Sequence, residues 1–171
     1  GAKSAGAALR RLVGLPRSAF GTALAHAGIG LTTLGIVCTL GFQAEQITTM
    51  RPGETAPIAG RTLRFDGVEP VRGPNYDETV AHFTLLSPSG SVLGTVDSAK
   101  RLYTARQMPT TEAGILTRGF SQLYVSLGDP TADGGIVVRI WWKPLVTLIW
   151  LGGLAMMLAG AISLSDRRLR V

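Results

Sequence analysis

Two long apolar runs divide the chain. Residues 20–42 and residues 144–164 contain no Asp, Glu, Lys or Arg. A helix rises about 1.5 Å per residue, so the first run would extend roughly 34 Å, enough to cross a hydrocarbon core of about 30 Å. The second run is nearly as long. We therefore predict two transmembrane helices.

The stretch between the two runs follows a different pattern. Apolar and polar positions alternate, as at Leu63 and Phe65 and again at Val138 and Ile140, and clusters of turn residues such as residues 88–90 interrupt them. Alternation with a period of two indicates strands with one buried face. Six or so short strands with close turns predict a small all-β domain, built as a barrel or a sandwich.

These patterns predict the fold class. We expect an integral membrane protein of α plus β type, in which two transmembrane helices flank a small all-β domain, barrel-like or sandwich-like. Within that domain, residues 111–116 are expected to form a helical turn. The predicted regions are a basic segment at 1–19, a helix at 20–43, the β-rich domain at 44–143, a helix at 144–164 and a basic tail at 165–171.

Charge adds an orientation. The net charge is +6, and the excess of basic residues lies in segment 1–19 and tail 165–171, whereas the middle is balanced. Basic flanks favour the cytoplasmic side of a membrane, so both ends are predicted to be cytoplasmic and the β-rich domain periplasmic. Nucleic-acid binding is disfavoured because the basic residues share no face with aromatic ones. Cys38 is the only cysteine, which excludes an internal disulfide.

His26 is the strongest chemical candidate because it lies inside the first apolar run. An ionisable side chain within a membrane is costly and is therefore a functional candidate. Small residues recur beside it at spacings of three and four, which predicts a face that packs closely against another helix. The residue type leaves three roles open: axial haem ligand, proton relay, or hydrogen bond between helices. The small residues are Gly21, Ala25, Gly28, Thr32, Gly35 and Thr39.

Other candidate residues suggest structural roles. His82 falls in a predicted strand outside the membrane, so we expect it at the surface and not as a second ligand beside His26. Asp77 and Glu78 are adjacent in a strand and should point to opposite faces. Trp141 and Trp142 are expected to anchor the domain at the membrane interface. We find no nucleophile elbow, phosphate loop or zinc spacing in the sequence.

Eight short stretches, taken together in this order, resemble the C-terminal part of the CcmF/NrfE-type cytochrome c haem lyases, the integral membrane component of System I maturation. The resemblance extends from about residue 20 to the end. The matching stretches are 24–28 (LAHAG), 51–54 (RPGE), 73–76 (GPNY), 111–113 (TEA), 123–129 (LYVSLGD), 143–146 (KPLV), 149–153 (IWLGG) and 166–168 (DRR).

The resemblance implies a function in the bacterial inner membrane. Members of this family attach haem to apo-cytochrome c in the periplasm, receive it from a CcmE-type haem chaperone, and hold a haem b within a multi-pass membrane domain. His26 matches the axial histidine in the helix before the periplasmic domain, so the resemblance makes it a haem iron ligand. The second axial ligand would come from a region outside this chain. A CcmH-type thiol component and apo-cytochrome c are the other expected partners.

The sequence therefore leaves two functions open. The preferred one is the C-terminal section of a haem lyase, which supplies one ligand of haem b and a docking domain but is not expected to be catalytic alone. The alternative is a non-catalytic, membrane-anchored interaction module of the maturation complex, in which His26 only packs.

Overall fold

The computed structural model describes residues 16–166, which form two compact units. Of the described residues, 16–38 and 145–166 form the helix unit, and Thr39–Pro144 form the β unit. Most of the two predicted basic segments, 1–19 and 165–171, lies outside the described residues.

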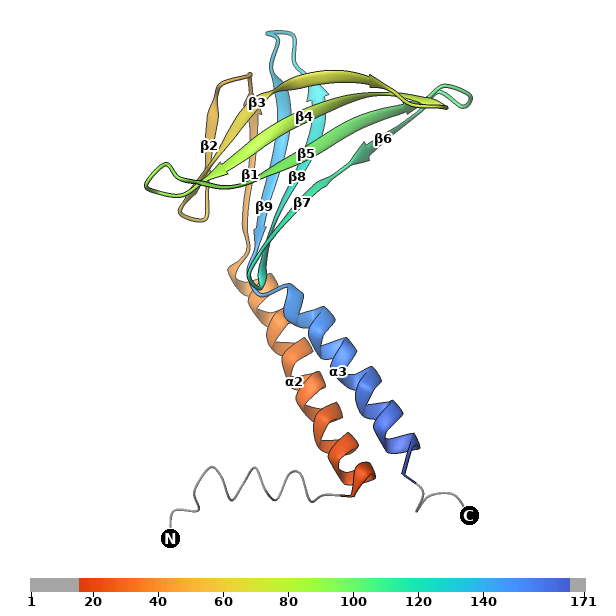
Figure 1. Ribbon diagram of the computed structural model, residues 1–171. Helices are drawn as coiled ribbons and strands as arrows, with labels where there is room; N and C mark the ends of the chain where they lie inside the picture. Colours follow the sequence, from red (N-terminus) through yellow and green to blue (C-terminus); the bar gives the residue numbers. More distant parts are fainter. Residues whose placement is uncertain (1–15, 167–171) are drawn as a thin grey trace. The chain divides into compact units, whose positions relative to one another are not determined.

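Two helices and nine strands make up the described part of the chain (Figure 1). The helices are α2 (Arg17–Phe42) and α3 (Thr147–Leu164). The strands are β1 (Ala44–Met50), β2 (Thr55–Ile58), β3 (Arg61–Arg72), β4 (Tyr76–Leu86), β5 (Val92–Tyr103), β6 (Met108–Glu112), β7 (Gly114–Arg118), β8 (Ser121–Pro130) and β9 (Ile136–Lys143).

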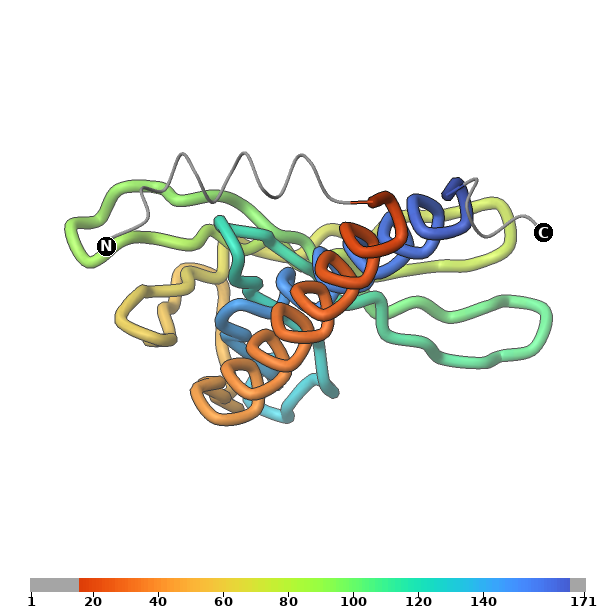
Figure 2. The backbone as a smooth tube through the Cα atoms, turned by 90° about the horizontal axis from the view of Figure 1, so that it is seen from below, coloured from red at the N-terminus to blue at the C-terminus, as the bar shows by residue number. Residues whose placement is uncertain are grey.

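The two helices pack side by side and antiparallel, as both views show (Figures 1 and 2). Their contact runs along Gly21, Gly28 and Gly35, which are the buried residues of α2. A Cβ atom added to Gly28 would lie 2.7 Å from the carbonyl oxygen of Gly152 on α3. The backbones therefore approach closely because these positions carry no side chain. The predicted small-residue face is confirmed as a helix-packing surface.

A buried carboxylate joins the ends of the two helices. Asp166 follows α3 and is 6% exposed. Its Oδ2 accepts a hydrogen bond of 3.0 Å from the backbone N–H of Ser18, in the first turn of α2. Arg17 Nη1 donates to the Ser165 carbonyl at 3.3 Å. A negative charge at a helix N-terminus satisfies a free backbone donor and interacts favourably with the helix dipole, so Asp166 caps α2 from the neighbouring helix.

Both helices are long and apolar enough to cross a membrane. An 18-residue stretch of the 26-residue helix α2 has a mean hydropathy of 1.7, and the 18 residues of α3 have a mean hydropathy of 1.9. Each exposes large apolar side chains, among them Leu40 and Trp150 at 70% and 74%.

The β unit is a sandwich of two antiparallel sheets, which decides between the two predicted architectures. One sheet has the strand order β1-β9-β8-β7 and the other has the order β2-β3-β4-β5-β6. The inward side chains of both sheets form one core, and its largest fully buried members are Phe65, Phe83, Met50, Leu63 and Leu85. Phe65 and Phe83 stack in this core with their ring centroids 5.0 Å apart.

The predicted helical turn at residues 111–116 is wrong. Residues 108–112 pair with β5, and residues 114–118 pair with β8, so the chain crosses from one sheet to the other at Ala113. Gly114 passes close to β5 directly after the crossing, since a Cβ atom at this position would lie 3.0 Å from the carbonyl carbon of Asp97. Ladder hydrogen bonds to two different strands satisfy this backbone better than a single helical turn would.

The prediction for the tryptophan pair is wrong for Trp142. This side chain is 7% exposed and belongs to the sandwich core. The guanidinium of Arg61 covers its ring at 4.0 Å from the centroid. Trp141 points to the opposite face of the sheet, because side chains alternate along β9.

Gly152→Ala is expected to loosen the helix pair. The new Cβ would lie 2.7 Å from the backbone nitrogen of Thr32, so the helices would have to separate. Overpacking of this kind lowers the free energy of unfolding by about 1–3 kcal/mol. Gly153→Ala is the matched control, because nothing lies within 4 Å of a Cβ at that neighbouring position. Thermal unfolding in detergent, followed by near-UV circular dichroism, measures the difference, and equal melting temperatures for the two variants would contradict the prediction.

Candidate functional site

His26 lies on α2 on a face that α3 does not cover, and its side chain is exposed in the helix unit. Its Nδ1 is 2.8 Å from the carbonyl oxygen of Thr22, one turn earlier in the helix. Since a carbonyl oxygen only accepts, Nδ1 carries the proton and Nε2 keeps its lone pair. The helix backbone thus fixes both the tautomer and the orientation of the ring.

The surface around the imidazole is small and weakly polar. Thr22, Gly30 and Thr33 are exposed, and Ile29 is 52% exposed. A Cβ atom at Gly30 would find no atom within 4 Å. The helix therefore offers open space one turn from His26, while the glycine contacts with α3 occupy another face.

This arrangement fits a haem ligand. Neutral imidazole with a free Nε2 is a good ligand for iron, and a hydrogen bond from Nδ1–H to a carbonyl is the usual outer support of such a ligand. The small residues leave room for a flat group beside the ring. Within residues 16–166 the helix unit supplies this single histidine, and we find no cluster of three metal-ligating side chains there.

His82 has a different setting, on the outer face of the five-stranded sheet. Its Nδ1 is 2.8 Å from Asp97 Oδ1, and its Nε2 is 3.7 Å from Glu69 Oε2. The hydrogen bond to Asp97 contributes most to raising the pKa of His82 above 6.5, and the charges of Asp97 and Glu69 add to it while burial opposes it. His82 therefore lies at the surface, as predicted, and both of its ring nitrogens face carboxylates, which the sequence analysis did not predict.

The acidic pair at the start of β4 is also structural. Asp77 pairs with Arg72 at 3.0 Å, whereas Glu78 pairs with Arg101 at 2.9 Å. Arg101 also reaches Glu112 at 3.3 Å. The two carboxylates point to opposite faces of the sheet as expected, and each is engaged by a different arginine.

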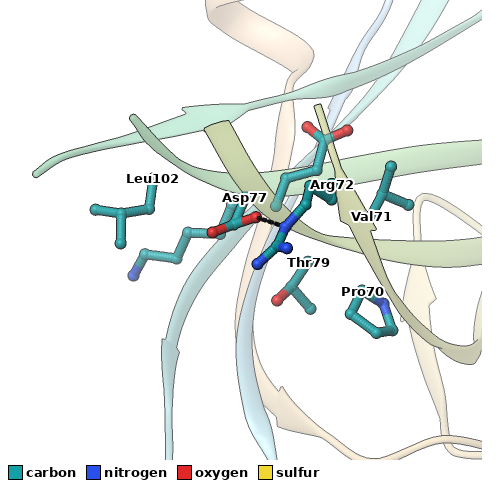
Figure 3. A pocket seen from close by; sticks show the side chains of 8 residues that line it. Pro70, Val71, Arg72, Asp77, Thr79 and Leu102 are labelled. Atoms are coloured by element: carbon teal, nitrogen blue, oxygen red, sulfur yellow. Dashed lines mark hydrogen bonds and ion pairs between the residues drawn. The ribbon is translucent and has the colours of Figure 1, made fainter. Parts of the chain in front are cut away.

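An open pocket of about 470 Å³, which the sequence analysis did not predict, lies on β3, β4 and β5 (Figure 3). The Arg72–Asp77 ion pair spans it, and Lys100 in its wall pairs with Asp129. Because each charged side chain of the lining has an ionic partner, shape and not net charge would select a ligand here. The lining residues are Pro70, Val71, Arg72, Asp77, Glu78, Thr79, Lys100 and Leu102.

The residues that sequence reasoning singled out belong to two different units. His26 belongs to the helix unit, and His82, Asp77 and Glu78 belong to the β unit. Asp166 is the residue whose role the sequence did not reveal. The sequence feature that could have indicated this role is its position as the first acidic residue after the second apolar run.

The fold defines a class of protein in which a β-sandwich is inserted between two apolar helices. A family model described as the CcmF C-terminal beta-sandwich matches residues 41–144. The chain belongs to the CcmF family and corresponds to a C-terminal section of its members.

Two relatives from other bacteria support this assignment. The cytochrome c-type biogenesis protein CycK of Rhizobium meliloti (strain 1021) is 60% identical over 171 residues, which is 100% of this chain and 25% of that protein. The cytochrome c-type biogenesis protein CcmF of Pseudomonas aeruginosa is 42% identical over 160 residues, covering 92% of this chain and 24% of that protein. The chain spans about a quarter of the length of these relatives.

A solved structure shares the fold. The structure titled cytochrome c heme lyase CcmF matches with a TM-score of 0.73 at 18% sequence identity. The match covers 87% of this chain and 25% of that one. Two apolar helices flanking a β-sandwich are thus an arrangement that this chain shares with a CcmF protein.

The Asp97 contact is expected to dominate the titration of His82. Asp97→Asn should lower the pKa of His82 more than Glu69→Gln does, because the shorter hydrogen bond is lost. A raised folded pKa means that the contact stabilises the fold below about pH 6.5, and that this stabilisation is lost as pH rises through the folded value. NMR titration of the chain with ¹³C-labelled histidine measures both variants. Equal shifts would contradict the ranking.

Proposed function

We propose that this chain is the C-terminal section of a membrane-embedded cytochrome c haem lyase, in which His26 is one axial ligand of a haem b. The observation that carries the proposal is the His26–Thr22 hydrogen bond of 2.8 Å, which leaves Nε2 free on an exposed helix face. Family membership supplies the link to cytochrome c biogenesis.

The membrane placement belongs to the same proposal. In it, residues 20–43 and 144–164 cross the bacterial inner membrane, residues 44–143 lie in the periplasm, and the basic segments 1–19 and 165–171 are cytoplasmic. The length and hydropathy of α2 and α3 support the two spans, and the flanking basic residues support the orientation.

The chain's own residues would perform three tasks at the haem. Thr22 holds the Nδ1 proton and aims the ring, the Nε2 lone pair of His26 binds iron, and Gly30 leaves space for the macrocycle. The glycine contacts with α3 and the Asp166 cap fix the rotation and height of α2, and with them the direction of the imidazole. The haem supplies a one-electron couple when bound. The second axial ligand lies outside this chain in this proposal.

A docking role for the β unit is the second candidate function. The pocket on β3, β4 and β5 adjoins a smaller one of about 140 Å³ that shares Thr79 and Lys100 with it. Such an open, charge-neutralised surface suits a polypeptide. A CcmE-type chaperone, a CcmH-type thiol component and apo-cytochrome c are the proposed partners, and this role would hold even if His26 only packs.

His26→Ala is expected to abolish the b-type absorbance band of the full-length protein and to lower its haem content at least severalfold. His82→Ala is the control and should retain the band, because its imidazole is held by Asp97 and Glu69. Reduced-minus-oxidised spectra and haem-to-protein ratios of purified protein measure both. Unchanged haem in the His26 variant would overturn the ligand assignment and leave the docking role standing.

Gly30→Leu is expected to reduce haem occupancy with His26 intact, because the side chain would fill the open space beside the imidazole. Gly41→Leu is the matched control on the same helix, since a Cβ there also meets nothing within 4 Å but lies four turns away from His26. Haem content is compared between the two variants, provided that their melting temperatures are equal. Equal haem retention in the two variants would show that Gly30 does not border the haem.

A further inference from the structure

One end of the four-stranded sheet gathers three segments. The register pairs Ala44 with Trp142 and Gln122 with Lys143. The start of β1, the end of β9 and the turn between β7 and β8 therefore lie at the same end. The turn itself comprises residues 118–121, and Arg118 pairs with Ser121 across it.

This end carries exposed aromatic and basic side chains. Phe120 in the turn is 54% exposed, and Arg118 beside it is exposed as well. Gly119, with a φ of +59°, supplies the left-handed residue that the tight turn requires. The tip of the hairpin thus presents a large apolar ring beside a cation.

The outer face of the sheet continues the same chemistry. Tyr124 and Trp141 are cross-strand neighbours whose ring centroids lie 5.3 Å apart at 70°. Lys143 Nζ is 5.2 Å from the Tyr124 ring centroid. Ile115, 56% exposed, pairs with Tyr124 on the β7 side, and the carboxylate of Glu45 ends the row on the β1 side. At this end of the sheet the aromatic and cationic groups are therefore carried by β7, β8 and β9, and the carboxylate of Glu45 by β1.

Chain connectivity limits how far this end can be from the helices. β1 begins two residues after the last residue of α2, and Lys143 precedes the first residue of α3 by four. An extended residue spans at most about 3.6 Å, so Lys143 lies within roughly 14 Å of the start of α3. This limit holds for any placement of the β unit. If both helices cross a bilayer, the end of the sheet must lie at or just above the headgroup layer.

We propose that this end of the sheet, formed by Arg118, Phe120, Tyr124, Trp141 and Lys143, contacts the phospholipid headgroup layer of the membrane that α2 and α3 cross. Tyr and Trp favour this layer because each has an apolar ring and a polar atom, and Lys and Arg can reach lipid phosphates from an apolar stem. Phe120 would enter the boundary of the acyl chains. The proposal rests on the membrane placement given above, and it assigns to the β7–β8 hairpin a lipid-binding role.

Spin labels on the full-length protein in phospholipid vesicles test the proposal. A Cys38→Ala background, cleared of any further cysteine, receives a single label through F120C or, as a second probe of the same surface, I115C. Collisions with oxygen, which dissolves in lipid, and with a nickel chelate, which stays in water, report the depth of each label. We expect oxygen collisions to exceed nickel collisions severalfold at both positions.

A132C is the matched control in the β8–β9 turn, at the other end of the same sheet. β8 has 10 residues, and at about 3.3 Å per residue the two turns are roughly 30 Å apart, so this label should be fully accessible to the nickel chelate. M157C on α3 checks the membrane placement, since it should be closed to the chelate. Every variant must keep the melting temperature of the background.

The outcomes separate the two proposals. Nickel access at positions 120 and 115 equal to that at position 132, with position 157 protected, overturns the lipid contact and leaves the membrane placement standing. Low access to both reagents at positions 120 and 115 shows that a protein surface covers the hairpin, and it overturns the proposal as well. Free nickel access at position 157 would contradict the membrane placement itself.

Discussion

The close approach of two helix backbones is the constraint on which the candidate site depends. Where α2 meets α3, glycine at positions 21, 28 and 35 removes the side chains that would hold the helices apart. The repeat of seven residues keeps one face of α2 against its partner over about four turns, and Asp166 fixes the axial position at the end. The packing of the two helices therefore directs His26 away from α3, although the His26 side chain is not part of the helix contact.

The β unit depends on ordinary sandwich packing combined with an ordered surface of ion pairs. Buried Phe65 and Phe83 hold the two sheets together, while charged side chains on the five-stranded sheet are matched across neighbouring strands. Exposed pairs such as Arg72–Asp77 contribute little stability, but together with Lys100–Asp129 and Arg101–Glu78 they neutralise the charges that line the pocket. What distinguishes the surface is where aromatic rings remain exposed, namely at the hairpin of β7 and β8.

The two helices and the all-β domain between them followed from the sequence because both rest on local periodicity, whereas the choice between barrel and sandwich needed the strand order. Freedom from charge over 20 or so residues and alternation at Leu63 and Phe65 are visible without a partner strand. The same alternation, continued from Val138 and Ile140, would have placed Trp142 in the core; the rule for interfacial tryptophans obscured it. The pocket could not be predicted from the sequence, since a bulge between Phe65 and Gly67 changes which β3 side chains face inward. The direction in which His26 points depends on where the partner helix packs, and only the spacing of the glycines indicated that position.

The pairing of β1 with β9 has a consequence for the helix unit. These two strands are the first and the last of the insertion, and they pair over the full length of β1 from Ala44 to Met50. An unfolded insertion of roughly 100 residues would disfavour closure between the helices by about 3 kcal/mol relative to a five-residue loop, because closure entropy grows with the logarithm of length. Once folded, the sandwich makes a long insertion behave like a short one. Substitutions deep in its core would then weaken a helix contact that they never touch.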